Sequence, residues 1–316
     1  MDAVLVTGGA GFIGSHTVGA LRAAGFRVVV LDDFSTGRRE NLAQWAGDPA
    51  VEVVVGDVRE DVAGLLAGRG PFAAVVHLAA QTSVIRSLAA PIADLDVNLR
   101  ATVQILLWAA SAGVRRLVFA SSAAVYGEPE RVPLDEDAQT RPLSPYGAAK
   151  RAAELYLGCL GPLHGVATTC LRLFNVYGPR QDPHSPYTGV VAAFLSRALR
   201  GEPPVIFGDG TQTRDLVYVG DVARAIALAV GQGPAGHVVC NIGTGREVSV
   251  AELARAALRV CGRSELTPAF APARAGEIAR SAAATGRAAE VLGFAVEVAL
   301  DEGLRRTAAW LSGQAG

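Results

Sequence analysis

The chain has 316 residues, of which half are hydrophobic and 19% are charged. This length is roughly twice that of a common domain, so we expect one large α/β domain with a smaller companion. The 29 basic and 30 acidic residues give a formal net charge of −1 and form no basic block, which argues against a nucleic-acid or lipid-surface partner.

The cysteines and histidines exclude two further classes. The four cysteines are widely spaced without a CxxC pair, and the histidines lack metal-ligand spacing, so we predict neither a disulfide framework nor a metal site. The first strand is expected to start at about Ala3, which leaves no room for a signal peptide, and no apolar run reaches about 18 residues. We therefore expect a soluble, cytoplasmic protein without a membrane partner.

Along the chain, six short β-branched runs alternate with longer helical stretches. The runs are AVLVTG, RVVVLDD, VEVVVGD, AAVVHLAA, RRLVFASS and ATTCLRLF, and the stretches between them include FIGSHTVGALRAAG and IADLDVNLRATVQILLWAASAG. Strands that are hydrophobic on both faces and separated by helices predict a doubly wound parallel sheet, the Rossmann arrangement. In such a sheet, ligands lie at the carboxyl ends of the strands.

The alternation of strands and helices becomes less regular after the sixth run. The stretch YGPRQDPHSPYTG is rich in proline, glycine and polar residues, which favours an ordered substrate loop. Short strands around VIFG and DLVYV and helices near 221–230, 249–261 and 301–311 are expected beyond it. We predict a nucleotide-binding Rossmann domain over residues 1–175 and a smaller α/β substrate-binding region over 176–316, partly interleaved with the first.

The first strand is followed by TGGAGFIG, which satisfies both GxGxxG and GxxGxxG and opens a helix. Glycines here permit a tight turn and let backbone N–H groups approach a pyrophosphate. Asp32 ends the second strand, where a carboxylate accepts hydrogen bonds from a ribose and repels a 2′-phosphate, so NAD is favoured over NADP. Arg38 and Arg39 could nevertheless tolerate that phosphate. Asp57, after the third strand, is placed either to contact adenine or to cap the next helix.

The heptapeptide SPYGAAK begins a helix with Tyr146 and Lys150 one turn apart. A lysine that simply pairs with Glu154 is the alternative for this motif alone. However, the preceding strand ends at Ser122, so a serine, a tyrosine and a lysine would converge at one strand end. A free phenol has a pKa of about 10. We expect the ammonium, together with a positive nicotinamide ring, to lower the pKa of Tyr146 and make it a base.

The motifs TGGAGFIGSH, LDDFSTG, SSAAVYG, SPYGAAK and RLFNVYGPRQDP together resemble the extended short-chain dehydrogenase/reductases, most closely the UDP-glucose (UDP-galactose) 4-epimerase family, over nearly the whole chain. The resemblance implies catalytic roles for Ser122, Tyr146 and Lys150. It places NAD at Gly8, Gly11, Phe12, Ile13, Gly14, Asp32, Asp57, Val58, Leu78, Ala79 and Lys150. It places a UDP-sugar at Thr82, Ser122, Tyr146, Asn175, Val205, Phe207, Arg214 and Arg274.

The arginine assignments also have a physical basis, because a guanidinium offers planar, multidentate donors to a diphosphate. Arg214 and Arg274 are the arginines expected to do this. Arg86 and Arg180 remain open between substrate binding and structure. Related sugar-nucleotide 4,6-dehydratases need an Asp-Glu pair directly after the catalytic Ser or Thr, and this chain has Ala123 and Ala124 there.

The resemblance therefore implies a 4-epimerase of UDP-glucose and UDP-galactose that works through a transient 4-keto sugar. Ser281 stands where a bulky tyrosine excludes N-acetyl sugars in some relatives, so UDP-N-acetylglucosamine is an alternative substrate. Thr82, Ser121, Ser122 and Arg86 could also suit the carboxylate of UDP-glucuronate. A plain NAD-dependent dehydrogenase and a non-catalytic dinucleotide sensor are further alternatives. By resemblance, a homodimer is expected through the helices at 91–112 and 146–161.

Overall fold

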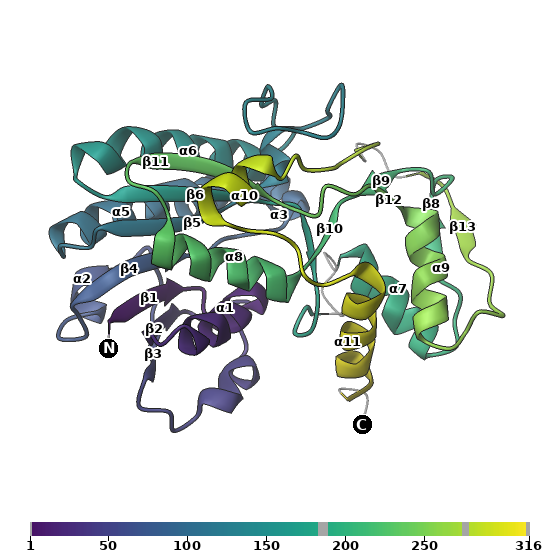
Figure 1. The fold of residues 1–316 in the computed structure, drawn as a ribbon, viewed down its shortest axis with the longest axis horizontal. Helices are drawn as coiled ribbons and strands as arrows, with labels where there is room; N and C mark the ends of the chain where they lie inside the picture. Colours follow the sequence, from purple (N-terminus) through teal and green to yellow (C-terminus); the bar gives the residue numbers. More distant parts are fainter. Residues whose placement is uncertain (1, 183–188, 274–277, 314–316) are drawn as a thin grey trace.

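The computed structural model describes residues 2–182, 189–273 and 278–313. A parallel sheet of seven strands forms its centre, in the order β11-β6-β5-β4-β1-β2-β3 (Figure 1). The strands are β1 (Ala3–Thr7), β2 (Arg27–Asp32), β3 (Val51–Val55), β4 (Phe72–His77), β5 (Arg116–Ser122), β6 (Ala167–Leu173) and β11 (His237–Ile242). The predicted doubly wound sheet and its first six strands are confirmed. The seventh, β11, was not predicted.

Helices cover both faces of this sheet. They include α1 (Phe12–Ala23), α5 (Ala101–Ser111), α6 (Pro145–Leu163), α8 (Val219–Gln232) and the shorter α10 (Gly286–Leu292). Alternate strand residues point to opposite faces, so Val4 belongs to the core beneath α1 and α8, whereas Leu5 belongs to the core beneath α5 and α6. Both side chains are fully buried, which explains why these strands are apolar on both faces.

Short helical segments fill the connections. They are η1 (Arg39–Trp45), α2 (Val62–Leu65), α3 (Val84–Ala89), α4 (Pro91–Leu95), η2 (Asp96–Arg100) and η3 (Ala123–Val125). The helix expected over the stretch that begins at Ile92 is therefore α4, a π-helical turn at η2, and α5 in succession. A π-helical turn widens a helix locally and is often found at functional sites.

A smaller body lies beside the sheet (Figure 1). It contains α7 (Val190–Leu199), α9 (Val250–Val260), α11 (Leu300–Gly313) and the strand pairs β7 (Asn175–Tyr177) with β10 (Leu216–Tyr218), β8 (Val205–Phe207) with β13 (Ala269–Ala271), and β9 (Thr213–Arg214) with β12 (Val248–Ser249). One apolar core joins α7, α9 and α11. Between visits to this body the chain returns to the sheet, because α8 packs on α1 and β11 pairs with β6.

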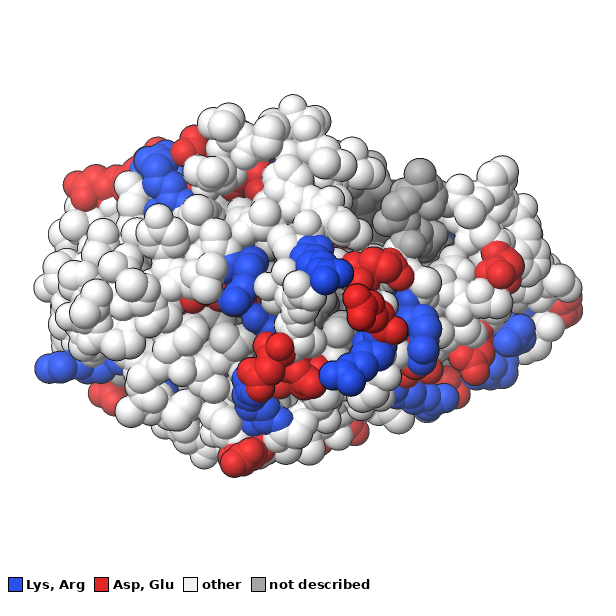
Figure 2. All heavy atoms as spheres, turned by 90° about the horizontal axis from the view of Figure 1, so that it is seen from above, with Lys and Arg blue, Asp and Glu red and all other residues white. Residues whose placement is uncertain are grey.

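The surface carries both signs of charge. Figure 2 shows acidic and basic side chains interspersed on one face instead of a broad field of one sign. None of the helices in the described part of the chain has the length and the apolar character that a membrane crossing requires.

Candidate active site

The glycine-rich turn lies between β1 and β4, where the strand order reverses and where open α/β sheets bind ligands. Gly8 has a φ of +71°, and a Cβ atom there would lie 2.7 Å from the backbone nitrogen of Ala79. A Cβ atom at Gly14 would overlap the backbone oxygen of Gly8. Glycine is therefore required at both positions, and the turn presents bare backbone to the edge of the sheet.

Helix α1 begins directly after this turn. Gly11 is its N-cap and supplies no side-chain hydrogen bond, and the first turn carries no acidic residue. The N–H groups of Phe12, Ile13 and Gly14 are thus free of a side-chain cap at the positive end of a twelve-residue helix. This arrangement fits the pyrophosphate of a dinucleotide.

Asp32 is fixed at the end of β2. One carboxylate oxygen accepts a hydrogen bond from the N–H of Ala10 at 2.8 Å and the other from the N–H of Phe34 at 2.9 Å. The side chain is buried, and burial raises the pKa of this carboxyl. Each oxygen can accept more than one hydrogen bond, so the group remains able to bind ribose hydroxyls. The two arginines considered for a 2′-phosphate have partners of their own, since Arg38 pairs with Asp182 at 2.8 Å and Arg39 lies over Phe34.

The residues that follow β3 and β4 are the remaining ones predicted to contact NAD. The Asp57 carboxylate receives the Arg59 side chain, with Nε at 3.0 and 2.9 Å, and these hydrogen bonds lower the pKa of Asp57. Its side chain is thus partly engaged within the protein, beside the buried Val58. After β4, the N–H of Leu78 donates to the backbone oxygen of Thr7 at 3.1 Å, and that of Ala79 to its hydroxyl at 3.3 Å. These bonds hold the two β4-exit residues against the glycine turn.

Tyr146 and Lys150 lie on the first turns of α6, which Ser144 caps by accepting a hydrogen bond from the N–H of Gly147 at 3.1 Å. The Lys150 side chain is buried, and its Nζ donates to the backbone oxygen of Ala120 at 2.9 Å. Nζ also lies 6.0 Å from the centre of the Tyr146 ring. Ala120 is in β5, two residues before Ser122, so the serine, the tyrosine and the lysine converge as predicted.

Burial has the largest effect on the pKa values of this group. Burial raises the pKa of Tyr146, and a hydrogen bond with Ser122 acts in the lowering direction without reversing the shift. Burial also lowers the pKa of Lys150 to about 8. The predicted lowering of the Tyr146 pKa by the lysine together with a nicotinamide ring stays a prediction, because in the protein alone burial is the largest influence on the phenol.

Comparison with known proteins identifies this combination of a glycine turn and a Tyr-Lys helix. The model described as the NAD dependent epimerase/dehydratase family matches residues 4–243. The chain belongs to this family. The match ends one residue after β11, so it reaches all seven strands of the central sheet and includes the first segment of the smaller body.

Individual members of the family are similar over their whole length. The UDP-glucose 4-epimerase of Mycolicibacterium smegmatis is 45% identical over 305 residues, or 96% of either chain. The crystal structure of UDP-glucose 4-epimerase with UDP-glucose from Thermotoga maritima matches this chain with a TM-score of 0.92 and 38% identity. The match covers 99% of this chain and 100% of that one. The complex of Thermus thermophilus UDP-glucose 4-epimerase with NAD has a TM-score of 0.87 and 40% identity over 98% and 99% of the two chains. The predicted resemblance and NAD as the cofactor are confirmed.

Residues expected to hold the substrate in this epimerase/dehydratase chain come from several elements. Thr82 is exposed in the loop after β4, and Asn175 is exposed at the start of β7. Val205 and Phe207 lie on β8, and Arg214 on β9 donates to the backbone oxygens of Thr213 and Ile278, each at 2.7 Å. Arg274 lies outside the described residues. Ser281, the position considered for N-acetyl sugars, is small and 9% exposed.

Two polar residues have partners other than those of the alternatives considered from the sequence. Glu154 does not pair with Lys150 but receives Nε and Nη2 of the buried Arg172 at 2.9 and 2.8 Å. Ser121 donates to the same carboxylate at 2.5 Å and is itself buried, so its hydroxyl is engaged within the protein instead of facing a sugar. Burial alone would raise the pKa of Glu154, but Arg172 outweighs it and the pKa is lowered.

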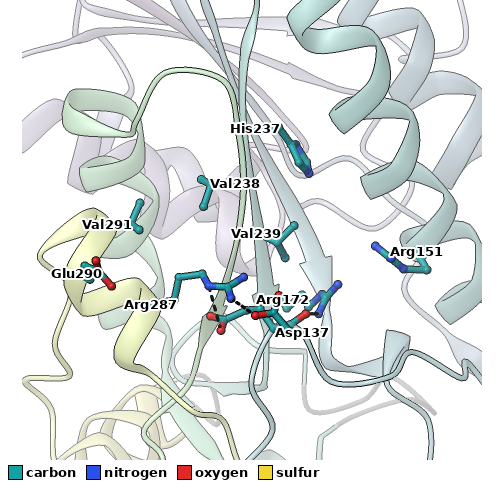
Figure 3. A pocket seen from close by; sticks show the side chains of 10 residues that line it. Asp137, Arg151, Arg172, His237, Val238, Val239, Arg287, Glu290 and Val291 are labelled. Atoms are coloured by element: carbon teal, nitrogen blue, oxygen red, sulfur yellow. Dashed lines mark hydrogen bonds and ion pairs between the residues drawn. The ribbon is translucent and has the colours of Figure 1, made fainter.

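A cavity of about 520 Å³ opens at the sheet edge beside β11, apart from the predicted site (Figure 3). Arg287 points across it to Asp137, with Nη2 at 2.6 Å from the carboxylate. Its lining also contains Arg151, Arg172, His237 and Glu290. It contains none of the residues predicted for NAD or substrate.

The sequence reading missed one buried polar cluster near the site. Gln81, Asp94 and Asn98, which we call the Asp94 cluster, are joined by side-chain hydrogen bonds. Asp94 and Asn98 are each 1% exposed. The signal available in the sequence was an Asp and an Asn four residues apart in a helical stretch, which places both on one side of the helix.

Proposed function

We propose that this protein interconverts UDP-glucose and UDP-galactose by inverting C4 through a transient 4-keto sugar, with NAD as its bound cofactor. The observation that carries the proposal is the convergence of Ser122, Tyr146 and Lys150 at the end of β5. The full-length similarity to proteins named UDP-glucose 4-epimerase supports this assignment.

NAD would lie across the carboxyl ends of β1, β2 and β4. The glycine turn and the start of α1 would receive the pyrophosphate, Asp32 the adenosine ribose, and Lys150 the other ribose. The remaining contacts are assigned to Asp57, Val58, Leu78 and Ala79. When bound, NAD supplies the capacity to accept a hydride from a sugar carbon and to return it.

The chain itself handles the proton. Tyr146 would take the proton from the C4 hydroxyl and later return it, while Ser122 hydrogen-bonds the same sugar oxygen. Because burial raises the pKa of Tyr146 in the protein alone, the phenol needs a second positive charge beside that of Lys150. The ring of oxidised nicotinamide carries such a charge, and it would favour the phenolate only when the cofactor is in place.

The substrate would be anchored by its nucleotide part. Arg214 and Arg274 would neutralise the diphosphate, and Asn175, Val205 and Phe207 would hold the UDP moiety, with Thr82 near the sugar. An anchored UDP leaves the keto sugar free to turn and to present its opposite face. The same carbon can then be reduced from the other side, so no net oxidation occurs.

The test is the inversion of UDP-glucose and UDP-galactose at C4 by purified protein without added NAD. Turnover with retained cofactor supports the proposal. Accumulation of NADH absorbance identifies a dehydrogenase instead, and loss of cofactor in each cycle contradicts the proposal. Comparing kcat/KM for UDP-glucose, UDP-N-acetylglucosamine and UDP-glucuronate decides between the hexose and the two alternatives, of which the buried Ser281 favours the N-acetyl sugar.

We also propose a homodimer through α5 and α6. Leu107 on α5 and Leu155, Tyr156 and Leu163 on α6 are 42 to 75% exposed, an unusual number of large apolar side chains for a free surface. Burying them against a second copy would remove them from water. Leu155→Asp should give monomers in sedimentation, whereas Leu143→Asp, at an exposed loop position, should not. The division at residue 175 and a cytoplasmic location stay predictions.

A further inference from the structure

The Asp94 cluster ties the loop after β4 to the helix that follows it. Asp94 Oδ1 accepts hydrogen bonds from Nε2 of Gln81 at 2.7 Å and from Nδ2 of Asn98 at 2.9 Å. The Asn98 amide also donates to the backbone oxygen of Gln81 at 2.9 Å. Gln81 in turn accepts a hydrogen bond from the N–H of Ser83 at 2.6 Å and donates to its carbonyl at 2.9 Å. One carboxylate oxygen thus organises the segment that carries Thr82.

The second oxygen of this carboxylate is unusual. Within the part of the chain that the structure describes, Asp94 Oδ2 is buried without a hydrogen-bond partner, and so is Asn98 Oδ1. A buried carboxylate oxygen without a donor is costly, so such groups are normally retained for a reason. A nearby cation is the usual compensation for a buried negative charge.

Lys150 is a buried cation on a helix that packs against the helix of Asp94. Helix α4, which carries Asp94, packs against α6, which carries Lys150. The negative charge of Asp94 acts in the raising direction on the pKa of both Lys150 and Tyr146, against the effect of burial on the lysine. Glu154 on α6 acts on the lysine in the same direction as Asp94, whereas burial raises the pKa of the Cys170 thiol on β6 and keeps it uncharged.

The remaining titratable group beside Lys150 is His77 at the end of β4. Burial lowers the pKa of His77 to about 3, so it is neutral near pH 7. The side chain is held between the hydroxyls of Thr7 at 2.7 Å and Thr102 at 3.1 Å. It therefore does not compete with Lys150 for the charge of Asp94.

The composition makes the ionisation of this lysine a special case. The chain has 28 arginines and one lysine, and the lysine is Lys150. An arginine in a protein is always charged, whereas a buried lysine can lose its proton. With burial lowering the pKa of Lys150 to about 8, a further fall would leave much of it neutral at physiological pH.

We propose that Asp94 is a positioning residue that ties the loop after β4 to α4 and keeps the Lys150 amine in its charged form. This inference deepens the proposed function and rests on it, because a charged Lys150 is what the proposed chemistry at Tyr146 requires. Asp94 acts through the lysine and the loop, and it need not touch the substrate.

The test uses the single lysine as a reporter. Protein labelled with ¹⁵N at the lysine Nζ gives one side-chain lysine signal, so nuclear magnetic resonance can titrate Lys150 directly in the full chain. Asp94→Asn keeps the shape and the Oδ1 acceptor but removes the charge. We expect the pKa of Lys150 to fall by about one unit and both limbs of the kcat pH profile to move to lower pH by a similar amount.

Two matched variants separate charge from structure. Asp96→Asn removes an exposed carboxylate that pairs with Arg100 at 2.9 Å, and it should leave the lysine titration and both limbs in place. Asp94→Glu keeps the charge, so the limbs of the kcat pH profile should not move. Its longer side chain disturbs the hydrogen bonds that hold the loop after β4, so kcat should fall. An Asp94→Asn protein that loses thermal stability or kcat while Lys150 titrates as in the wild type would overturn the inference, and so would Asp94→Glu titrating like Asp94→Asn.

The lysine titration also distinguishes failure of this inference from failure of the proposed function. If the wild-type protein does not invert C4 of any UDP-sugar, the proposed function is wrong, yet the shift between wild type and Asp94→Asn can still be measured. If C4 inversion occurs and that shift is absent, only the role of Asp94 is wrong.

Discussion

The Lys150 ammonium donates a hydrogen bond to the backbone oxygen of Ala120 at 2.9 Å and so joins α6 to β5 two residues before Ser122. The same amine lies 4.6 Å from the centre of the Phe119 ring, where a buried cation gains attraction from the aromatic face. One side chain therefore fixes the spacing between the helix that carries Tyr146 and the strand end that carries Ser122. A change of its charge affects both geometry and proton affinity.

Tyr146→Phe removes the hydroxyl but keeps the ring. We expect kcat for C4 inversion to fall by about a hundredfold to ten-thousandfold, the usual contribution of a positioned proton-transfer group, with NAD still bound. Product is measured by chromatography of the two UDP-hexoses. Tyr156→Phe, on the exposed side of the same helix, is the control and should keep full activity. Equal losses in the two variants would contradict the role of Tyr146.

Asp32→Asn tests the nucleotide end. Loss of the charged acceptor should weaken NAD binding by about tenfold to a hundredfold, measured by calorimetry on protein stripped of cofactor. Asp33→Asn is the neighbouring control, because Asp33 is exposed and accepts hydrogen bonds from Ser35. If NAD affinity is unchanged in Asp32→Asn, the ribose is held elsewhere.

Gly8→Ala tests the close approach at the glycine turn. Gly8 and Gly25 share a left-handed backbone, with φ values of +71° and +86°, so alanine is strained at both. A Cβ atom at Gly25 meets nothing within 4 Å, whereas at Gly8 it would collide with the segment at Ala79. Gly8→Ala should therefore lower the melting temperature more than Gly25→Ala and abolish cofactor retention. Similar melting temperatures would show that the collision is relieved.

Lys150→Met should have opposite effects on stability and activity. Burial lowers the pKa of Lys150 from 10.5 to about 8, so between these values the unfolded chain binds more protons than the folded one. The contribution of Lys150 to the free energy of unfolding therefore rises with pH across that window, and its penalty is complete below it. Lys150→Met should raise the free energy of unfolding near neutral pH by roughly 1–3 kcal/mol and abolish activity.

Denaturant unfolding at several pH values measures this effect. The advantage of Lys150→Met over the wild type should shrink as the pH rises from about 8 toward 10.5, because the wild-type lysine then loses its charge in the folded state. A difference that is constant with pH would show that the lysine is stabilised by contacts instead of penalised by burial.

Arg172→Met tests the buried ion pair. It leaves the Glu154 carboxylate without its main partner and should cost about 3–5 kcal/mol of unfolding free energy. Arg151→Met removes a half-exposed partner of the same carboxylate, at 3.0 Å, and should cost less than about 1 kcal/mol. Urea unfolding compares the two. Equal costs would mean that Ser121 and the remaining donors compensate for Arg172.

The sequence predicted what depends on local pattern. The six strands carry apolar residues on both faces, and the glycine turn and SPYGAAK are local signals, so their places in the sheet were found. β11 was missed because HVVCNI begins with a half-exposed region and becomes a sheet strand only by pairing with β6, about 70 residues earlier in the chain.

Long-range packing decided the remainder. The pKa of Tyr146 rises because the folded chain buries the phenol, and no spacing in SPYGAAK reports burial. Glu154 pairs with Arg172 instead of Lys150 because β6 passes beneath α6 and brings a guanidinium to it. Ser121 was considered as a partner for the carboxylate of UDP-glucuronate, but the alternation along β5 turns its hydroxyl to the Glu154 side.

The return of the chain to β11 has a consequence for how such enzymes diversify. The smaller body is built from two segments that leave the sheet, one after β6 and one after β11, so it is joined to the sheet at each crossing. Lengthening or altering one of these segments changes the smaller body without disturbing the hydrogen bonds between neighbouring strands of the sheet. Deleting both segments as one continuous piece would also remove β11, the outermost strand, and would leave β6 at the edge of the sheet. The two bodies are therefore inherited together.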